Sequence, residues 1–331
     1  MSRCLAALFL LAFASYLALM TPFVQTRLVT YFADLLGKRL GTEIVIGKVD
    51  FRPIESLVLS DVYVKGFAND TLLYCRRLTA RVDSVSFVKR RATVTELDFD
   101  GAVFNLWVSR DSAGSRTNVE MLLDPLSREG AGSSRPGSPG WRVSLERIRL
   151  RNSRLRYMED QYEPVEYGIN WTDVDCRGLD ADISGISFDG GTYAAEVSGL
   201  RFREKSGFRV NRMGGRVVIR EDNMLITSAD ISTDKSFIHL DTLRYDWVPD
   251  RKYWKYFVHK MRQRYVFSNT AVNFDDLAYF NGRLLGMENT VSGSGVVTGT
   301  IDSLSGERLD LALGDTTRLR GSFRSRGLPR I

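Results

Sequence analysis

The side chains most often used in acid–base or nucleophilic catalysis are sparse in this chain of 331 residues. Only two histidines occur, His239 and His259, and His239 alternates with apolar neighbours as a strand residue does. The motifs HExxH, GxSxG and GxxxxGK[ST] are absent from the sequence. Asp98 and Asp100 share one face of a predicted strand, which is typical of a solvated face. We therefore predict that the protein is not an enzyme and uses no cofactor.

The three cysteines do not form a metal or redox motif. Cys4 lies in the apolar N-terminal segment, and Cys75 and Cys176 are far apart in the chain. No CxxC pair occurs, which argues against a zinc knuckle or a dithiol redox site. An oxidising compartment would permit a Cys75–Cys176 disulfide. We favour two unpaired thiols in apolar surroundings, where cysteine behaves as a small hydrophobic residue.

Basic residues exceed acidic ones, 46 to 40, which gives a formal net charge of +6. Both signs are mixed along the chain, so this excess predicts only a weak attraction to anionic surfaces. The segment RIRLRNSRLR places Arg147, Arg149 and Arg151 on one strand face, opposite Ile148 and Leu150. Single-stranded nucleic acid would require aromatic platforms beside the arginines, and the opposite face here is aliphatic. We predict a solvated outer face and no nucleic-acid partner.

Between residues 42 and 246 the apolar residues recur at every second position, which is the period of a β-strand. GTEIVIGKVDF alternates at Ile44 and Ile46 and resumes at Val49 after a Gly-Lys step. LVLSDVYVKG, LDFDGAVFNLW and IRLRNSRLRY each contain two alternating runs, separated by an Asp, Gly or Asn step. We interpret each as a strand, a tight bend or bulge, and a strand. The predicted fold class is mainly β, an elongated, curved and largely antiparallel sheet of many short strands.

One face of this predicted sheet is apolar almost throughout, and the other is charged or polar. An apolar sheet face must pack against a second layer or hold an apolar ligand, because it would otherwise aggregate. Few segments after Gly41 could cover it, since long amphipathic helices are missing there. We expect a groove open to lipid chains, and a closed β-sandwich remains the alternative. The groove candidates, each of which would be a core residue in a sandwich, are Ile44, Ile46, Leu57, Leu59, Phe99, Phe104, Leu106, Leu150, Leu155, Val217 and Ile219.

The first 24 residues predict a membrane anchor. No charged residue occurs between Cys4 and Val24, and this run is long enough for a membrane-spanning helix. A cleaved signal peptide is the alternative, because Ala12-Phe13-Ala14 fits the small-x-small cleavage rule. We favour an uncleaved anchor, since cleavage there would leave the apolar residues Tyr16–Met20 at the new end. Both interpretations place the remaining chain outside the cytoplasm.

Residues 25–41 predict an amphipathic helix that follows Thr21-Pro22 and ends at Gly41. Its apolar face could lie on the bilayer surface or cap the end of the sheet. We prefer the cap, because exposed sheet ends need covering. The later segment 127–140 is rich in Gly, Ser and Pro, and we interpret it as a linker or insertion between the strands of 42–126 and those of 141–331.

Residues Arg251–Tyr265 predict the one helix of the second half of the chain. Aromatic residues alternate there with lysine and arginine, which suits either a membrane interface or a helix packed over a sheet edge. The membrane-surface candidates are Tyr253, Trp254, Lys255 and Phe257.

The order of these elements resembles a known family. An anchor, a helix, GTEIVIGKVDF, LVLSDVYVKGFANDTLLYCRRLTARVD and LDFDGAVFNLWVSRDSAGSRTNVEMLLDPL resemble the N-terminal region of AsmA-like proteins, especially the TamB-type translocation and assembly proteins. SGFRVNRMGGRVVI, FIHLDTLRYDW and SGSGVVTGTIDSL resemble the continuing β-repeats of the same proteins. The resemblance covers almost the whole chain, and it lies in a pattern of strands rather than in a catalytic signature.

The resemblance implies a long groove lined by apolar side chains, a β-taco. It implies a protein anchored in the inner membrane by residues 4–24, with its bulk in the periplasm, where residues 42–126 begin the groove. The implied function is the movement of phospholipid between inner and outer membranes. The alternative is a scaffold or chaperone that receives outer-membrane strands by β-augmentation beside an Omp85-type partner. Such proteins are longer and meet that partner through a C-terminal domain without counterpart here, so we expect 141–331 to be truncated β-repeats.

Overall fold

The computed structural model describes residues 21, 27, 30, 31, 33, 34, 37, 38, 40–52, 56–66, 70–86, 91–111, 114–119, 142–160, 164–189, 191–248, 260–314 and 316–327. Three predictions fall outside these residues. They are the membrane anchor apart from Thr21, the linker at 127–140, and the membrane-surface candidates Tyr253, Trp254, Lys255 and Phe257.

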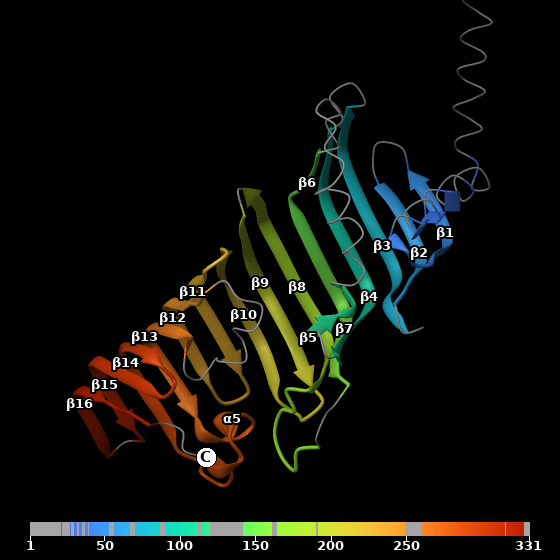
Figure 1. Ribbon diagram of the computed structural model, residues 1–331. Coiled ribbons are helices and arrows are strands. Elements are labelled where there is room, and N and C mark those ends of the chain that lie inside the picture. Colours follow the sequence, from blue (N-terminus) through green and yellow to red (C-terminus); the bar gives the residue numbers. More distant parts are fainter. Residues whose placement is uncertain are drawn as a thin grey trace, which may run out of the picture. The chain divides into compact units, whose positions relative to one another are not determined.

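The chain divides into two compact units, Met1–Tyr162 and Glu163–Ile331 (Figure 1). Strands dominate both units, and most neighbouring strands are antiparallel, which confirms the predicted mainly β class. The boundary between the units follows β7 and does not coincide with the predicted linker at 127–140.

The sheet of the first unit has the strand order β1-β2-β3-β4-β7, and β5 and β6 also pair with β4. Its strands are β1 (Ile44–Arg52), β2 (Ser56–Lys65), β3 (Thr71–Ser86), β4 (Arg91–Asp111), β5 (Gly114–Thr117), β6 (Arg142–Leu145) and β7 (Arg147–Glu159). The largely antiparallel pattern has an exception here, because β6 and β7 run parallel to β4. Parallel pairing requires a long crossover, and residues 112–141 between β4 and β6 supply the length.

The second unit is an antiparallel meander in which each strand pairs with the next along the chain. Its strands are β8 (Asp173–Asp189), β9 (Thr192–Glu204), β10 (Arg209–Ile219), β11 (Asn223–Thr233), β12 (Phe237–Asp246), β13 (Arg262–Asn273), β14 (Thr290–Thr300), β15 (Ser303–Leu313) and β16 (Thr317–Arg324). A short helix, α5 (Phe274–Ala278), and a 3-10 turn, η2 (Gly282–Leu284), lie between β13 and β14.

The steps predicted between alternating runs are single left-handed residues inside continuous strands. Asp61 in β2, Gly101 in β4 and Asn152 in β7 have φ angles of 53°, 68° and 44°. Ser228 in β11 and Arg308 in β15 have φ angles of 51°. Such a residue shifts the side-chain alternation by one position. At Ser228 and Arg308 the strand also has one residue more than its partner, which is a β-bulge. The pairing register runs unshifted through Asp61, Gly101 and Asn152. The predicted pair of short strands is therefore one continuous strand in β2, β4 and β7.

The shift keeps apolar side chains on one face along the whole strand. Leu59 before Asp61 and Val62 after it both belong to one cluster, although a regular strand would place them on opposite faces. Residues that directly follow a left-handed position are deeply buried. Their exposed fractions are 6% for Val62, 0% for Ala102, 1% for Ser153, 1% for Ala229 and 3% for Leu309. Deep burial thus accompanies these five left-handed residues in both units.

The helix predicted at Arg251–Tyr265 is wrong at its C-terminal end, because residues from Arg262 onward belong to β13. Tyr265 pairs with Leu243 of β12 and with Val297 of β14. Pairing on both sides satisfies the backbone of this segment and overrides its local helical pattern.

Residues described between Arg27 and Leu40 have helical backbone conformation. Gly41 follows in the left-handed region with a φ of 66°, and the Thr42 N–H donates to the Gly37 carbonyl at 2.9 Å, which is a Schellman C-cap. Leu40 packs against Leu72 at the start of β3. The end of this helical segment therefore contacts the end of the first sheet.

The left-handed conformation of Ser228 leads to a prediction about stability. Valine at Ser228 should reduce the free energy of unfolding by about 1–2 kcal/mol, because a β-branched side chain is disfavoured at positive φ. Glycine at the same position should be tolerated. Ser187→Val in β8 is the matched control, since Ser187 is also an exposed strand serine but has ordinary φ. Equal urea-unfolding curves for Ser228→Val and Ser187→Val would contradict the role given to the bulge.

Candidate functional site

The apolar face of the first unit is built from rows of paired residues. One row runs from Ile44 through Val64, Leu73 and Phe104 to Leu155. Other rows contain the remaining candidates of this unit. They pair Ile46 with Val62, Leu59 with Leu78, Leu57 with Ala80, Phe99 with Leu78 and Leu150, and Leu106 with Tyr157. Paired residues on neighbouring strands share a face, so the candidates of this unit lie together on one side of its sheet.

The second unit has an apolar face of the same construction. Val217 pairs with Ala195 and Ile226, and Ile219 pairs with Tyr193 and Met224. The Val217 row continues across the meander through Leu243, Tyr265 and Val297. Val217 and Ile219 therefore lie on one face with these apolar neighbours.

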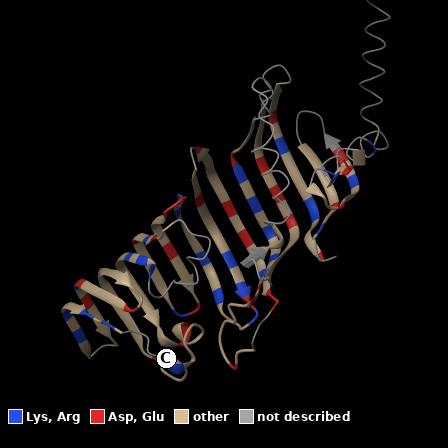
Figure 2. Cartoon of the chain, viewed as in Figure 1, with Lys and Arg blue, Asp and Glu red and all other residues tan. Residues whose placement is uncertain are grey.

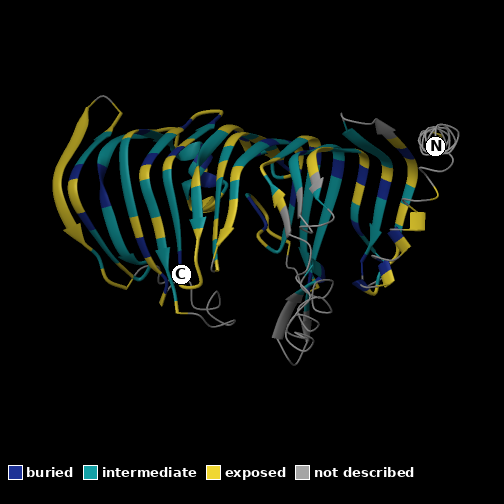
Figure 3. Cartoon of the chain, turned by 90° about the horizontal axis from the view of Figure 1, so that it is seen from above, coloured by how far each residue is buried: buried dark blue, intermediate teal, exposed yellow. Residues whose placement is uncertain are grey.

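Both apolar faces are accessible in this structure. Of the eleven predicted residues none is buried: ten are half-buried, and Ile219 is 40% exposed. Phe188 and Tyr193, whose ring centroids are 4.6 Å apart, are 65% and 56% exposed. Intermediate exposure predominates along the strands in Figure 3. A closed sandwich would bury most of these side chains, so each face is available to an apolar ligand.

The opposite face of the first unit carries an ion-pair ladder (Figure 2). Arg151 contacts Asp98 at 2.8 Å, and Arg76 contacts Asp100 at 2.7 Å. Glu96, which is 6% exposed, lies 3.3 Å from both Arg81 and Arg149. Burial raises the pKa of Asp98, although Arg151 and Arg149 oppose that shift. The arginines predicted to face outward at 149 and 151 therefore pair with acidic residues of β4.

His239 occupies the corresponding polar face of the second unit. Its Nδ1 lies 2.6 Å from an Asp230 oxygen, and its Nε2 lies 3.6 Å from Asp241. The hydrogen bond to Asp230 raises the pKa of the imidazole, although desolvation opposes it. Ser268 donates to Asp241 at 2.9 Å rather than to His239, so the group lacks the nucleophile–base hydrogen bond of a hydrolase.

The raised pKa of His239 predicts that the free energy of unfolding depends on pH. A pKa raised in the folded state means that His239 contributes stability below its unfolded pKa of about 6.5, and that the contribution disappears as the pH rises through the folded pKa. The stability difference between the native chain and His239→Gln should therefore be larger at pH 5.5 than at pH 9. Urea unfolding at the two pH values measures it, and a difference that does not change with pH would contradict the assignment.

The cysteine prediction is confirmed for the two described thiols, because Cys75 and Cys176 are free and buried. Cys75 pairs with Val62 and Ala102 in the tightly packed row of the first sheet. Burial raises the pKa of both thiols, and that of Cys176 reaches about 11. Both should therefore be unreactive near neutral pH.

One end of the second apolar face is capped by α5 and the residues after it. Tyr279 packs with the cluster of Ile169, Phe208 and Val210, and its ring lies 5.5 Å from that of Phe208. Phe280 meets Phe208 edge-on at 5.1 Å. The sequence pattern did not predict this helix, although Asn273 followed by Asp275 is an N-terminal capping signal, and the Asn273 side chain accepts from the Asp275 N–H.

Polar contacts fasten α5 to the sheet. The carboxylate of Asp276, which is 8% exposed, accepts hydrogen bonds from Thr233 at 2.6 Å and Ser236 at 2.5 Å. The Asn273 N–H also donates to Ser236, at 2.9 Å. These contacts join α5 to the turn between β11 and β12, and Tyr279 adds the packing on Phe208, which directly precedes β10.

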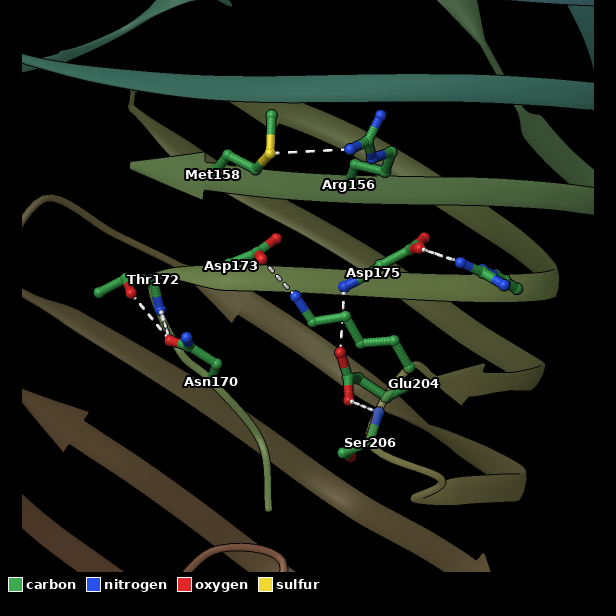
Figure 4. A network of polar contacts seen from close by, with 10 residues as sticks. Arg156, Met158, Asn170, Thr172, Asp173, Asp175, Glu204 and Ser206 are labelled. Carbon is green, nitrogen blue, oxygen red and sulfur yellow. Dashed lines mark hydrogen bonds and ion pairs between the residues drawn. The ribbon is translucent and has the colours of Figure 1, made fainter. Parts of the chain in front are cut away.

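Glu204 closes the neighbouring β9–β10 turn, as Figure 4 shows. Its carboxylate is almost fully buried and accepts from the backbone N–H of Asp175 at 3.1 Å and of Ser206 at 2.6 Å. Lys205 pairs with Asp173 at 2.5 Å. The network joins the turn to the start of β8. No motif in the sequence indicated it, because the partners are far apart in the chain.

Close packing at Gly168 gives a matched pair of substitutions. Gly168 and Gly286 have similar φ angles of 89° and 84°, but a Cβ on Gly168 would collide with the Tyr279 carbonyl oxygen, whereas a Cβ on Gly286 meets nothing within 4 Å. The Ile169 N–H donates to that carbonyl at 2.8 Å. Alanine should cost about 1–2 kcal/mol of conformational strain at either site. Gly168→Ala should lower the thermal unfolding midpoint further, and equal midpoints would show that α5 is not docked here.

Comparisons with known proteins found no match: no protein-family model, no curated protein and no solved structure is similar to this chain. Within the described part of the chain, no helix combines the length and hydropathy that crossing a bilayer requires. The same residues contain no group of three or more His, Cys, Asp and Glu side chains arranged to hold a metal.

Proposed function

We propose that the apolar faces bind the acyl chains of phospholipids and carry them between the inner and outer membranes of a cell envelope. In this proposal residues 4–24 anchor the chain in the inner membrane, and the sheets lie in the periplasm. The observation that carries it is the accessibility of the predicted apolar residues, of which ten are half-buried and Ile219 is exposed. The resemblance to AsmA-like proteins supports the same function.

The two faces of the first sheet have the chemistry that such a function needs. Burial of an acyl chain contributes about 0.8 kcal/mol for each CH₂ group removed from water, and it requires no directed polar contact. The rows through Phe104 and Phe99 provide aliphatic and aromatic side chains for this burial. The ion pairs of Arg151 and Arg76 lie on the opposite face, so they do not interrupt the apolar surface.

Neighbouring residues on opposite faces provide the test. A photo-crosslinking amino acid at Leu59 or Phe104 should capture phospholipid in cells, because both side chains lie on the apolar face. The matched controls are Val58 and Val103, which are also half-buried but alternate to the other face. Mass spectrometry of the crosslinked products identifies the captured molecules. Equal capture at Leu59 and Val58, or capture of protein alone, would contradict lipid binding by this face.

A charge on the apolar face should abolish transport. Leu59→Asp should remove most of the lipid that copurifies with the chain, because an acyl chain would have to desolvate the carboxylate. Val58→Asp is the control, since Val58 lies among polar residues that include Lys48 and Arg77. Circular dichroism establishes that both variants are folded. A folded Leu59→Asp protein with its lipid retained would refute the proposal.

A second candidate function rests on strand β16. All eight residues of β16 are exposed, and within the described residues it pairs only with β15 (Figure 3). Such an edge could accept a further strand, which would suit a scaffold for outer-membrane proteins beside an Omp85-type partner. The two functions differ in what copurifies with the full chain. Stoichiometric phospholipid favours the conduit, and barrel proteins without lipid favour the scaffold.

A further inference from the structure

A cluster of exposed apolar side chains lies at the edge of the second unit that α5 caps. Two short segments contribute to it, the residues before β8 and the residues after α5. We call it the aromatic edge patch. Its members and exposed fractions are Val165 49%, Tyr167 40%, Trp171 60%, Phe280 50%, Leu285 56% and Met287 46%. Exposed apolar side chains gathered in this way mark an interaction surface.

Ring contacts hold the patch in a defined arrangement. The ring centroids of Trp171 and Phe280 are 5.8 Å apart, and those of Tyr167 and Tyr279 are 5.7 Å apart and stacked. Each pair joins a residue that precedes β8 to a residue that follows α5. The aromatic part of the surface is therefore arranged before any partner binds, which lowers the ordering cost of binding.

The backbone after α5 satisfies its own hydrogen bonds. The N–H groups of Phe280 and Asn281 donate to the Leu277 carbonyl, and those of Leu284, Leu285 and Met287 donate to carbonyls three residues earlier. A segment that enters lipid must satisfy its backbone internally, and this one largely does. A protein partner that adds a strand would instead need unpaired backbone groups, which the same bonds remove.

Charge and composition also favour a bilayer. The charges beside the patch include Arg283, Glu166 and Glu288, and the Lys235–Asp275 ion pair acts on Tyr167, so positive and negative charges are mixed and neither sign dominates. Tryptophan and tyrosine, together with leucine and methionine, suit the interfacial region, where apolar bodies are buried and polar tips stay hydrated. This chemistry fits a zwitterionic lipid surface better than an acidic or basic macromolecule.

The patch is continuous with the apolar face. The ring centroids of Phe280 and Phe208 are 5.1 Å apart, and Phe208 packs with Val210 and Phe202 of the sheet. We propose that the aromatic edge patch docks into the interface of a phospholipid bilayer. If the proposed lipid function holds, this is where acyl chains pass between a membrane and the second apolar face. The passage of acyl chains at this patch rests on the proposed function, whereas the docking to a bilayer does not.

A local reporter tests the docking in the full chain. Leu285→Cys carries an environment-sensitive NBD label in a Cys4→Ser background, in which Cys75 and Cys176 are buried. Ser187→Cys in β8 is the control, because Ser187 is also exposed but pairs with Ala194 on the polar face of the same sheet. Phosphatidylcholine vesicles should shift the NBD emission at 285 to the blue, and doxyl-labelled lipid should quench it. Neither change should occur at 187.

The reporter remains informative if the N-terminal segment also binds vesicles, because only the label near the patch should enter the bilayer. Emission that is unchanged at 285, or that changes equally at 285 and 187, overturns the proposal. Adding Trp171→Ser and Phe280→Ser should remove most of the signal at 285. If that variant does not fold, the comparison of 285 with 187 still decides.

Crosslinking at Leu59 separates this inference from the proposed function. Docking at 285 without phospholipid crosslinking at Leu59 would sustain the patch and refute lipid carriage. Crosslinking at Leu59 without a response at 285 would refute the patch and leave the conduit in place.

Discussion

The structure depends on a constraint on strand alternation. A regular strand turns successive side chains to opposite faces, so a long strand keeps one apolar face only if its pattern never slips. Here the pattern slips once in the middle of strands such as β2 and β4, and a left-handed residue at the slip restores the face. Asp61 and Gly101 are therefore structural requirements, and the small, buried Ala102 beside Gly101 shows how closely the strands pack along that line.

This constraint separates the chemistry of the two faces. Apolar rows collect on one side of each sheet, while Glu96 and Asp98 meet arginines on the other. Solvent-exposed ion pairs contribute little to stability, so the ladder mainly fixes which side faces water. The buried carboxylate of Glu96 between two arginines is a stronger determinant, because an unpaired charge there would be costly.

The second unit adds a cap that the alternating pattern does not contain. α5 lies at the sheet edge because Asp276 binds the β11–β12 turn and Tyr279 packs on Phe208. The cap covers one end of the apolar face, and its outer side presents Phe280 to solvent beside Trp171, which precedes β8. The same short segment therefore protects part of the face and creates the surface from which we infer membrane docking.

The sequence by itself determined the mainly β class, the steps at Asp61, Gly101 and Asn152, and the apolar candidates, because these depend on periodicity and on residues that tolerate positive φ. It did not determine the parallel pairing of β4 with β7, the strand at Arg262–Tyr265, or the cap at α5. Those depend on contacts between distant residues, such as Glu204 with Asp175 and Gly168 with Tyr279. Local pattern cannot encode them, since pairing energy from neighbouring strands outweighs the preference of a short segment.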